Sequence, residues 1–139
     1  MSIHGERVFV DWVIAVLTDG GLTVGDATAP KCASPTGAGY VVVYSIAGGE
    51  TMGSVDAPRS DAAANFQVTS VSSDPRQARW LVDKVRSLLD AAVPASLSAG
   101  RSVIWLDFPL ASPSVLRDDN VQPPNYWAPD RFEVGTTPS

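Results

Sequence analysis

The chain has 139 residues, of which 45% are hydrophobic and 18% are charged, as expected for one domain with a single core. Its ten basic and fifteen acidic residues give a net charge of −5, opposite in sign to what sequence-independent nucleic-acid binding requires. One cysteine, Cys32, and one histidine, His4, exclude an internal disulfide, a cysteine-based zinc site and most histidine-dependent catalysis. We therefore predict no catalytic residues, no metal and no cofactor.

The N-terminal segment predicts an amphipathic helix. Apolar side chains recur at helical spacing over residues 6–18, and Gly20-Gly21 follow, a pair suited to the left-handed turn at a helix C-terminus. The longest apolar run contains Asp11 and is about half as long as a bilayer span, so no membrane segment is expected. Acidic residues in the same region argue against a signal peptide.

Two strands are predicted next. In residues 40–46 every second residue, from Tyr40 to Ile46, is aromatic or β-branched, and Val41 and Val43 make the opposite face apolar as well, which favours a central strand. Residues 65–72 predict a second strand. The preceding segment, 23–39, is rich in small and turn-forming residues and predicts a loop. Between the strands, residues 48–54 have the glycine spacing of a phosphate-binding loop but lack its lysine, so we interpret them as a turn.

The second helix has the clearest sequence signals. Asp74 and Pro75 supply an N-cap acceptor and a proline at the first helical position, and Pro94 ends the segment. Its apolar stripe consists of Ala78, Leu81, Val82, Val85, Leu88, Leu89 and Ala92. Trp80 falls on the opposite, polar side of the helix. This placement predicts either an interface or a cover supplied by residues 123–127 of the same chain.

Three more strands are predicted in the C-terminal part. Residues 101–108 predict a strand with Val103 and Trp105 on the same face. Residues 114–117 predict a short strand, and residues 131–136 predict the last one.

Prolines separate the last two of these strands. Pro123-Pro124 and Pro129 predict an extended arm rather than regular structure, within the segment 109–139. The resulting order, α-β-β-α-β-β-β, predicts a single α+β domain in which one mixed or antiparallel sheet packs against two helices.

A set of motifs runs through the chain from residue 39 onward. It consists of Gly39-Tyr40-Val41-Val42-Val43-Tyr44, Gly48-Gly49, Gly53-Ser54, Ser60-Asp61-Ala62, Phe66-Gln67-Val68-Thr69-Ser70-Val71, residues 74–86, residues 117–124 and Arg131-Phe132. In these motifs the chain resembles the tail terminator (tail-completion) proteins of long-tailed phages, in the form found in phages of actinobacteria. The motifs are patterns of fold and packing and contain no catalytic residues.

The resemblance implies an α/β subunit that is assembled in the host cytoplasm and forms a closed ring, generally a hexamer, at the head-proximal end of the virion's tail tube. There it would stop tube polymerisation and dock to the connector proteins of the head, while genomic DNA passes through without specific binding. The implied partners are copies of itself, the tail tube protein and a head-completion or connector protein. Two alternatives stay open: another neck protein, such as a head-completion stopper, and a small cytoplasmic ligand-binding α+β domain.

A closed ring of identical subunits requires two different adhesive faces on each subunit. We predict one on the second helix, formed by Arg76, Arg79, Trp80 and Asp83. The other is predicted in the loop 53–61, which contains Arg59, or in the proline-bearing arm with Tyr126 and Trp127.

The acidic balance predicts the character of the ring's channel. A negative subunit repels DNA phosphates within a Debye length of about 8 Å, so DNA could pass without sticking. The acidic residues predicted to face this channel are Asp56, Asp61, Asp118 and Asp119. Adjacent carboxylates on an extended chain point to opposite sides, so Asp118 and Asp119 are not predicted to share a metal ion.

Overall fold

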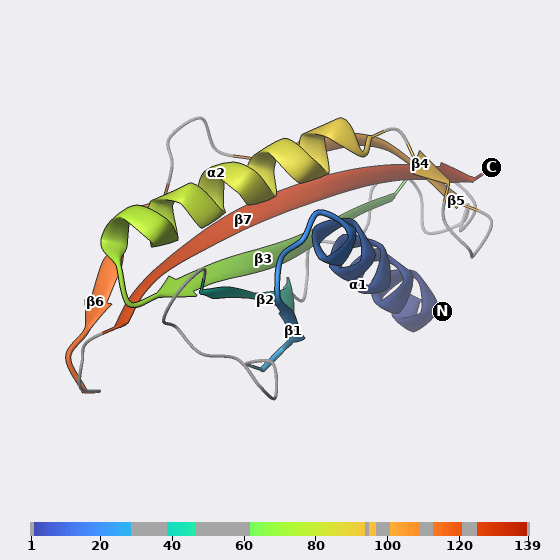
Figure 1. Cartoon of the computed structure of the whole chain (residues 1–139). Coiled ribbons are helices and arrows are strands. Elements are labelled where there is room, and N and C mark those ends of the chain that lie inside the picture. The colour runs from blue at the N-terminus through green and yellow to red at the C-terminus, as the bar shows by residue number, and fades with distance from the viewer. Residues whose placement is uncertain are drawn as a thin grey trace.

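The computed structural model describes residues 2–28, 39–46, 62–93, 95–96, 101–108, 113–120 and 125–138 of the chain. In chain order the elements are α1 (Ser2–Asp19), β1 (Val24–Asp26), β2 (Tyr40–Ile46), β3 (Ala62–Ser72), α2 (Pro75–Ala91), β4 (Ala95–Ser96), β5 (Arg101–Asp107), β6 (Leu116–Asp118) and β7 (Asn125–Pro138) (Figure 1). They form one α+β domain with two helices and one mixed sheet, which confirms the predicted fold class.

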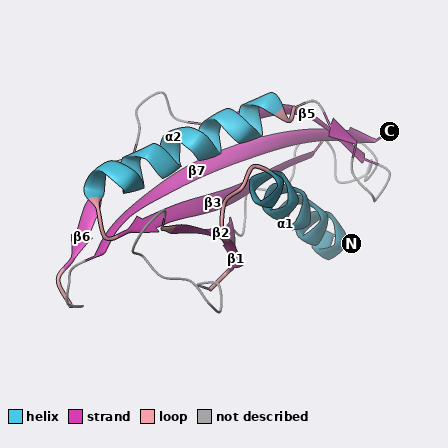
Figure 2. Cartoon of the chain, in the orientation of Figure 1, coloured by secondary structure: helices cyan, strands magenta, loops and turns pink. Residues whose placement is uncertain are grey.

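The seven strands in the described residues belong to one sheet, drawn in magenta in Figure 2. Its order is β1-β2-β3-β7-β5-β4, and β6 pairs with β7 outside this path. The β1–β2 pair is parallel and the other pairs are antiparallel. β7 pairs with β3 along one side, and with β6 and then β5 along the other. β6 and β5 therefore lie at opposite ends of β7 (Figure 1).

Both helices pack on the same face of the sheet, and the core lies between the two layers. The buried apolar residues of this core are Phe9, Val10, Val13 and Leu17 of α1, Leu81, Val85 and Leu89 of α2, and Val41, Val43, Phe66, Val68, Val103, Phe132 and Val134 of the strands. At its centre the rings of Phe66 and Phe132 stack with centroids 5.1 Å apart. Since successive residues of a strand point to opposite faces, every second residue of these strands lies on the face away from the helices.

The two helix termini that the sequence predicts have the expected local geometry. After α1, Gly21 has a φ of +92°, and the N–H groups of Gly21 and Leu22 donate to the carbonyls of Thr18 and Leu17 at 3.0 and 3.2 Å. This is the Schellman pattern of a helix C-terminus. At the start of α2, the Asp74 side chain accepts from the Arg76 N–H at 3.0 Å.

One predicted loop contains a strand. β1 lies within the segment 23–39, and it pairs in parallel with β2 in the register Val24↔Val41. The Val41 N–H donates to the Thr23 carbonyl at 2.9 Å, and the Ala27 N–H donates to the Val43 carbonyl at 2.8 Å. A strand of three residues is too short to show periodicity, so its partner strand rather than its own sequence determines it. The two-residue β4 was missed for the same reason.

β5 confirms the predicted strand at its position but corrects the assignment of its faces. The register shifts between Val103 and Trp105, as at a β-bulge, so that Val103 pairs with Thr136 whereas Trp105 pairs with Gly135. The extra residue breaks the simple alternation. Leu106 pairs with the buried Val134 and packs against the core, on the same side of the sheet as Val103.

The prediction of a proline-rich arm was wrong for residues 125–130, because they form the first half of β7. The last strand, predicted over residues 131–136, is confirmed as the second half of the same strand. Pro129 pairs in register with Thr69 of β3. On the other side of β7, the pairing with β6 reaches Trp127 and the pairing with β5 starts at Glu133. Around Pro129, β7 therefore has a described strand on one side only. A proline fits such a position because the N–H that it lacks is not needed by a second neighbouring strand. Pro123 and Pro124 lie outside the described residues.

Candidate functional site

The face of the sheet opposite the helices, which we name the open face, gathers large side chains from distant parts of the sequence. Tyr44, Leu116 and Trp127 lie on it with exposed fractions of 36, 41 and 36%. Register places Leu116 of β6 opposite Trp127 of β7, and Trp127 opposite Val71 of β3. Val71 in turn pairs with Tyr40 of β2. Contiguous exposed apolar surface of this kind is typical of interaction sites.

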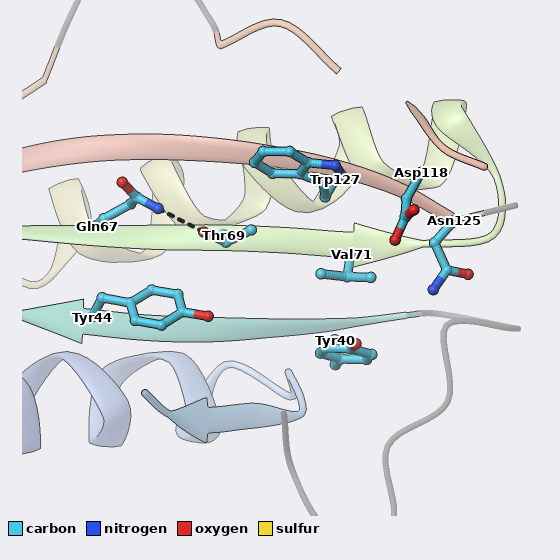
Figure 3. Close-up of a pocket in the computed structure, with 8 residues that line it drawn as sticks. All are labelled: Tyr40, Tyr44, Gln67, Thr69, Val71, Asp118, Asn125 and Trp127. Carbon is cyan, nitrogen blue, oxygen red and sulfur yellow. Dashed lines mark hydrogen bonds between the residues drawn. The ribbon is translucent and has the colours of Figure 1, made fainter. Parts of the chain in front are cut away.

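These residues surround a hollow of about 490 Å³ on the open face, which Figure 3 shows with the helices behind the strands. Its lining comes from four strands and consists of Tyr40, Tyr44, Gln67, Thr69, Val71, Asp118, Asn125 and Trp127. Gln67 Nε2 donates to Thr69 Oγ1 at 2.9 Å, which fixes the amide against the floor. Asp118 supplies the only carboxylate among the lining residues, and its Oδ1 accepts from the Asn120 N–H at 3.0 Å.

Two tyrosines form one side of the hollow (Figure 3). Burial raises the pKa of the Tyr40 phenol above its ordinary value of 10.0, and the nearby Tyr44 phenol raises it further. Tyr40 therefore stays protonated at neutral pH, and its hydroxyl can donate a hydrogen bond to a group that enters the hollow. Together with the Asp118 carboxylate and the Trp127 ring, it gives the hollow an aromatic wall and an acidic rim.

A second surface lies on α2. Its buried residues, Ala78, Leu81, Val82, Val85 and Leu89, form the side against the sheet. At about 100° per residue, Trp80 lies on the opposite side, where its side chain is 48% exposed. Arg76 lies one turn before it and Lys84 one turn after it, and Arg79 and Asp83 are also exposed on the helix. We name these five residues, 76, 79, 80, 83 and 84, the α2 outer face.

The structure tests the intrachain explanation of Trp80 for the residues that it describes. Tyr126 and Trp127 belong to β7, and Trp127 lies on the open face, on the other side of the sheet from α2 (Figure 3). The expectation that Trp127 folds over Trp80 was therefore wrong. Tyr126, its neighbour in β7, falls on the helix side of the sheet by strand alternation and is half-buried.

A buried ion pair links α2 to β7 beneath these surfaces. Arg86 Nε lies 2.6 Å from Asp130 Oδ2, and Arg86 Nη2 lies 2.8 Å from Asp130 Oδ1. The two side chains are only 11% and 4% exposed, and the guanidinium lies 4.6 Å from the centre of the Phe108 ring. The hydrogen bonds to Asp130 are the main cause that raises the pKa of Arg86 above its ordinary value. The sequence did not single out this pair, since its members are 44 positions apart.

The predicted acidic residues do not gather in the described part of the chain. Asp118 lines the hollow, whereas Asp119 is 69% exposed and pairs with Arg117 at 2.5 Å. The two adjacent carboxylates thus have different partners. Asp56, Asp61 and Arg59 lie outside the described residues, as does the segment 48–54. Cys32 lies outside them too, and the side chain of His4 is not described.

Two surfaces of the described residues present exposed aromatic side chains. No group of three histidine, cysteine or acidic side chains among them is arranged to hold a metal ion. None of the helices in the described residues combines the length and apolar character needed to cross a membrane. The two surfaces can bind: the α2 outer face presents an indole between cations, and the hollow presents aromatic rings beside a carboxylate.

Comparison with known proteins shows a shared fold. No family model matches the chain, and no curated protein matches it by sequence. Among solved structures, the chain is similar to a chain of the virion of a native gene transfer agent particle, with a TM-score of 0.51 and 15% identity over 89% of this chain and 83% of that one. A second solved structure has a TM-score of 0.43 and 21% identity over 93% of this chain and 89% of that chain.

Proposed function

We propose that this chain is a structural, non-enzymatic subunit of a phage-like virion, and that its place there is that of the tail terminator. Two independent features support the proposal. The fold is shared with a virion chain of a gene transfer agent particle over most of both chains. The motifs of β2, β3 and α2 resemble those of tail terminator proteins, and the described residues offer binding surfaces without a metal cluster.

The observation that carries the proposal is the pair of unlike surfaces on opposite sides of the subunit. Trp80 stands exposed among cations on the α2 outer face, and Trp127 and Leu116 stand exposed beside an aromatic hollow on the open face. Exposed tryptophan is uncommon on a surface that stays in water, and it is enriched in interfaces. Two different adhesive surfaces are what a cyclic ring requires of every subunit.

In this role the ring, generally a hexamer, sits on the head-proximal end of the tail tube, ends its polymerisation and contacts a connector protein of the head. Genomic DNA passes through the channel, and the net charge of −5 suits passage without binding. We assign the channel to Asp119 and to Asp56 and Asp61. Asp118 we assign to subunit contact, because it lines the hollow.

The experiment that tests this function measures tail tubes. The tube protein of the same particle is polymerised with and without the purified chain, which carries a gold label, and electron micrographs give tube length and label position. A terminator shortens the tubes and places the label at one end only. Tubes of unchanged length without end label, compared with an unrelated acidic domain as control, would overturn the assignment.

Removing the gene separates the two neck roles. Loss of a terminator yields overlong tubes and heads without tails. Loss of a head-completion stopper, the alternative neck protein, leaves tubes of normal length that are not joined to heads. A ligand-binding domain would instead show a clear rise in melting temperature with nucleotides or divalent metals and leave both tubes and heads unchanged.

A further inference from the structure

We propose that the Trp80 indole of one copy of this chain docks into the open-face hollow of the next copy, with Arg76 of the first copy facing Asp118 of the second. The inference rests on the proposed function, because a ring of identical subunits supplies the second copy. It adds to that function a defined pair of contact surfaces and the residues that form them.

The positions of the two surfaces allow the contact to repeat. α2 covers one face of the sheet, and Trp80 points away from the sheet because the opposite side of the helix is buried. The hollow is on the other face of the sheet, as Figure 3 shows with α2 behind the strands. Each copy therefore presents Trp80 on one side and the hollow on the other. When Trp80 of one copy contacts the hollow of the next, the row of subunits keeps one free surface of each kind at its two ends until the ring closes.

The chemistry of the two surfaces is complementary. The hollow, of about 490 Å³, has Tyr40, Tyr44 and Trp127 in its lining, which suit the faces and edges of an incoming indole. Asp118 is the charged member of that lining, and its second carboxylate oxygen can accept from a guanidinium. Arg76, on the same side of α2 as Trp80, can supply that donor.

Charge also favours this pairing over contact between two identical surfaces. Residues 76–84 contain three basic residues and one acidic residue, so two α2 outer faces repel each other. Two hollows would bring the Asp118 carboxylates of both copies together at low exposure to water, which is equally unfavourable. The arrangement that neutralises both surfaces is the one between unlike surfaces of two copies.

The test uses two variants and their mixture. In Trp80→Ala the α2 outer face is defective and the hollow is intact, whereas in Trp127→Ala the reverse holds. When either variant is measured by itself, every contact between its copies includes one defective surface. Each variant should therefore self-associate at least about thirtyfold more weakly than the wild type. Mixed in equal amounts, they can form one intact contact, from the α2 outer face of Trp127→Ala to the hollow of Trp80→Ala. Sedimentation velocity and native mass should then show a one-to-one dimer and nothing larger.

Matched controls keep the result interpretable. Asp90→Ala changes another exposed residue of α2, and Arg131→Ala changes an exposed residue of β7 outside the hollow. Both should associate as the wild type does. Arg76→Asp and Asp118→Arg should each weaken association, and the double variant should restore it. Circular dichroism and melting temperature check that every variant is folded.

Several outcomes would overturn the docking. They are variants that assemble like the wild type, a single variant that still dimerises alone, a double charge reversal that restores nothing, and a wild type that remains monomeric at about 500 µM. None of these outcomes affects the tube-length experiment. If the chain caps the tubes but all of its variants assemble like the wild type, the docking is wrong and the proposed function still holds.

Discussion

The buried pair Arg86–Asp130 allows a quantitative prediction about what holds α2 on the sheet. We consider Asp130→Ala, Arg86→Met and the double variant Arg86→Met/Asp130→Leu. Two hydrogen bonds of 2.6 and 2.8 Å join the side chains in a bidentate pair, and the side chains are 11% and 4% exposed. Charge centres about 4 Å apart attract by about 4 kcal/mol at an effective dielectric constant of about 20. Removing one partner also leaves the other charge buried, so each single variant should lose about 3–5 kcal/mol of unfolding free energy.

The double variant should behave differently. It buries apolar side chains where the ions were, and its loss should be far smaller than the sum of the two single losses. Because the pKa of Arg86 is raised, the guanidinium remains charged at every pH below its ordinary value, and the contribution of the pair is not lost between neutral pH and about pH 10.

Equilibrium unfolding in urea, followed by tryptophan fluorescence and by circular dichroism, measures these changes. The exposed pair Arg117–Asp119 is the control within the same chain. Its side chains are 57% and 69% exposed, so Asp119→Ala should cost less than about 1 kcal/mol. Single losses below about 1 kcal/mol in the buried pair, or a double variant as costly as the sum, would refute the reasoning.

Three further predictions concern stability. Gly39→Ala should lower the free energy of unfolding in urea by more than Gly21→Ala does. Both positions have a positive φ, which costs an alanine about 1–2 kcal/mol. Only at Gly39 would the new methyl group also collide with the Val71 carbonyl. Tyr40→Phe should flatten the loss of melting temperature above pH 10.0, because a raised folded-state pKa gives stability that is complete below the unfolded value and lost as pH rises through the folded one. Asp74→Ala should cost about 1 kcal/mol in the same unfolding assay, whereas Asp74→Asn should cost less, since the amide oxygen can still accept from the first turn of α2.

Local sequence signals were sufficient for the elements that depend on their own residues. α2 could be predicted because an N-cap, a first-turn proline and an apolar stripe agree, and β2 because aromatic and β-branched residues occupy both of its faces. Trp80 could be singled out because it contradicts the stripe on which its helix depends. Trp80 is exposed in the structure because the apolar stripe on the other side of the helix packs against the sheet.

What the sequence could not predict depends on contacts between distant segments. The hollow joins residues of four strands, and the short β1 and β4 exist only through their partners. The arm was predicted from the rule that proline interrupts a sheet, and that rule depends on which strands flank the proline. The register of β7 with β6 and β5, which is not visible in the sequence, decides whether Pro129 can be accommodated.

β7 connects the buried pair to the open face, and this link leads to a last prediction. Asp130 points to the helices and the neighbouring Pro129 and Trp127 side chains lie on the open face, so a slip of one residue would turn Trp127 away from the hollow. If the ion pair set this register, Arg86→Met/Asp130→Leu would remain folded but lose self-association. We expect instead that the double variant still self-associates. The Phe132 ring and the introduced leucine side chain both lie on the helix side and are apolar, so their burial keeps the register of β7. Sedimentation velocity of the double variant should therefore match the wild type, and a folded variant that no longer associates would show that the charges specify the strand's position.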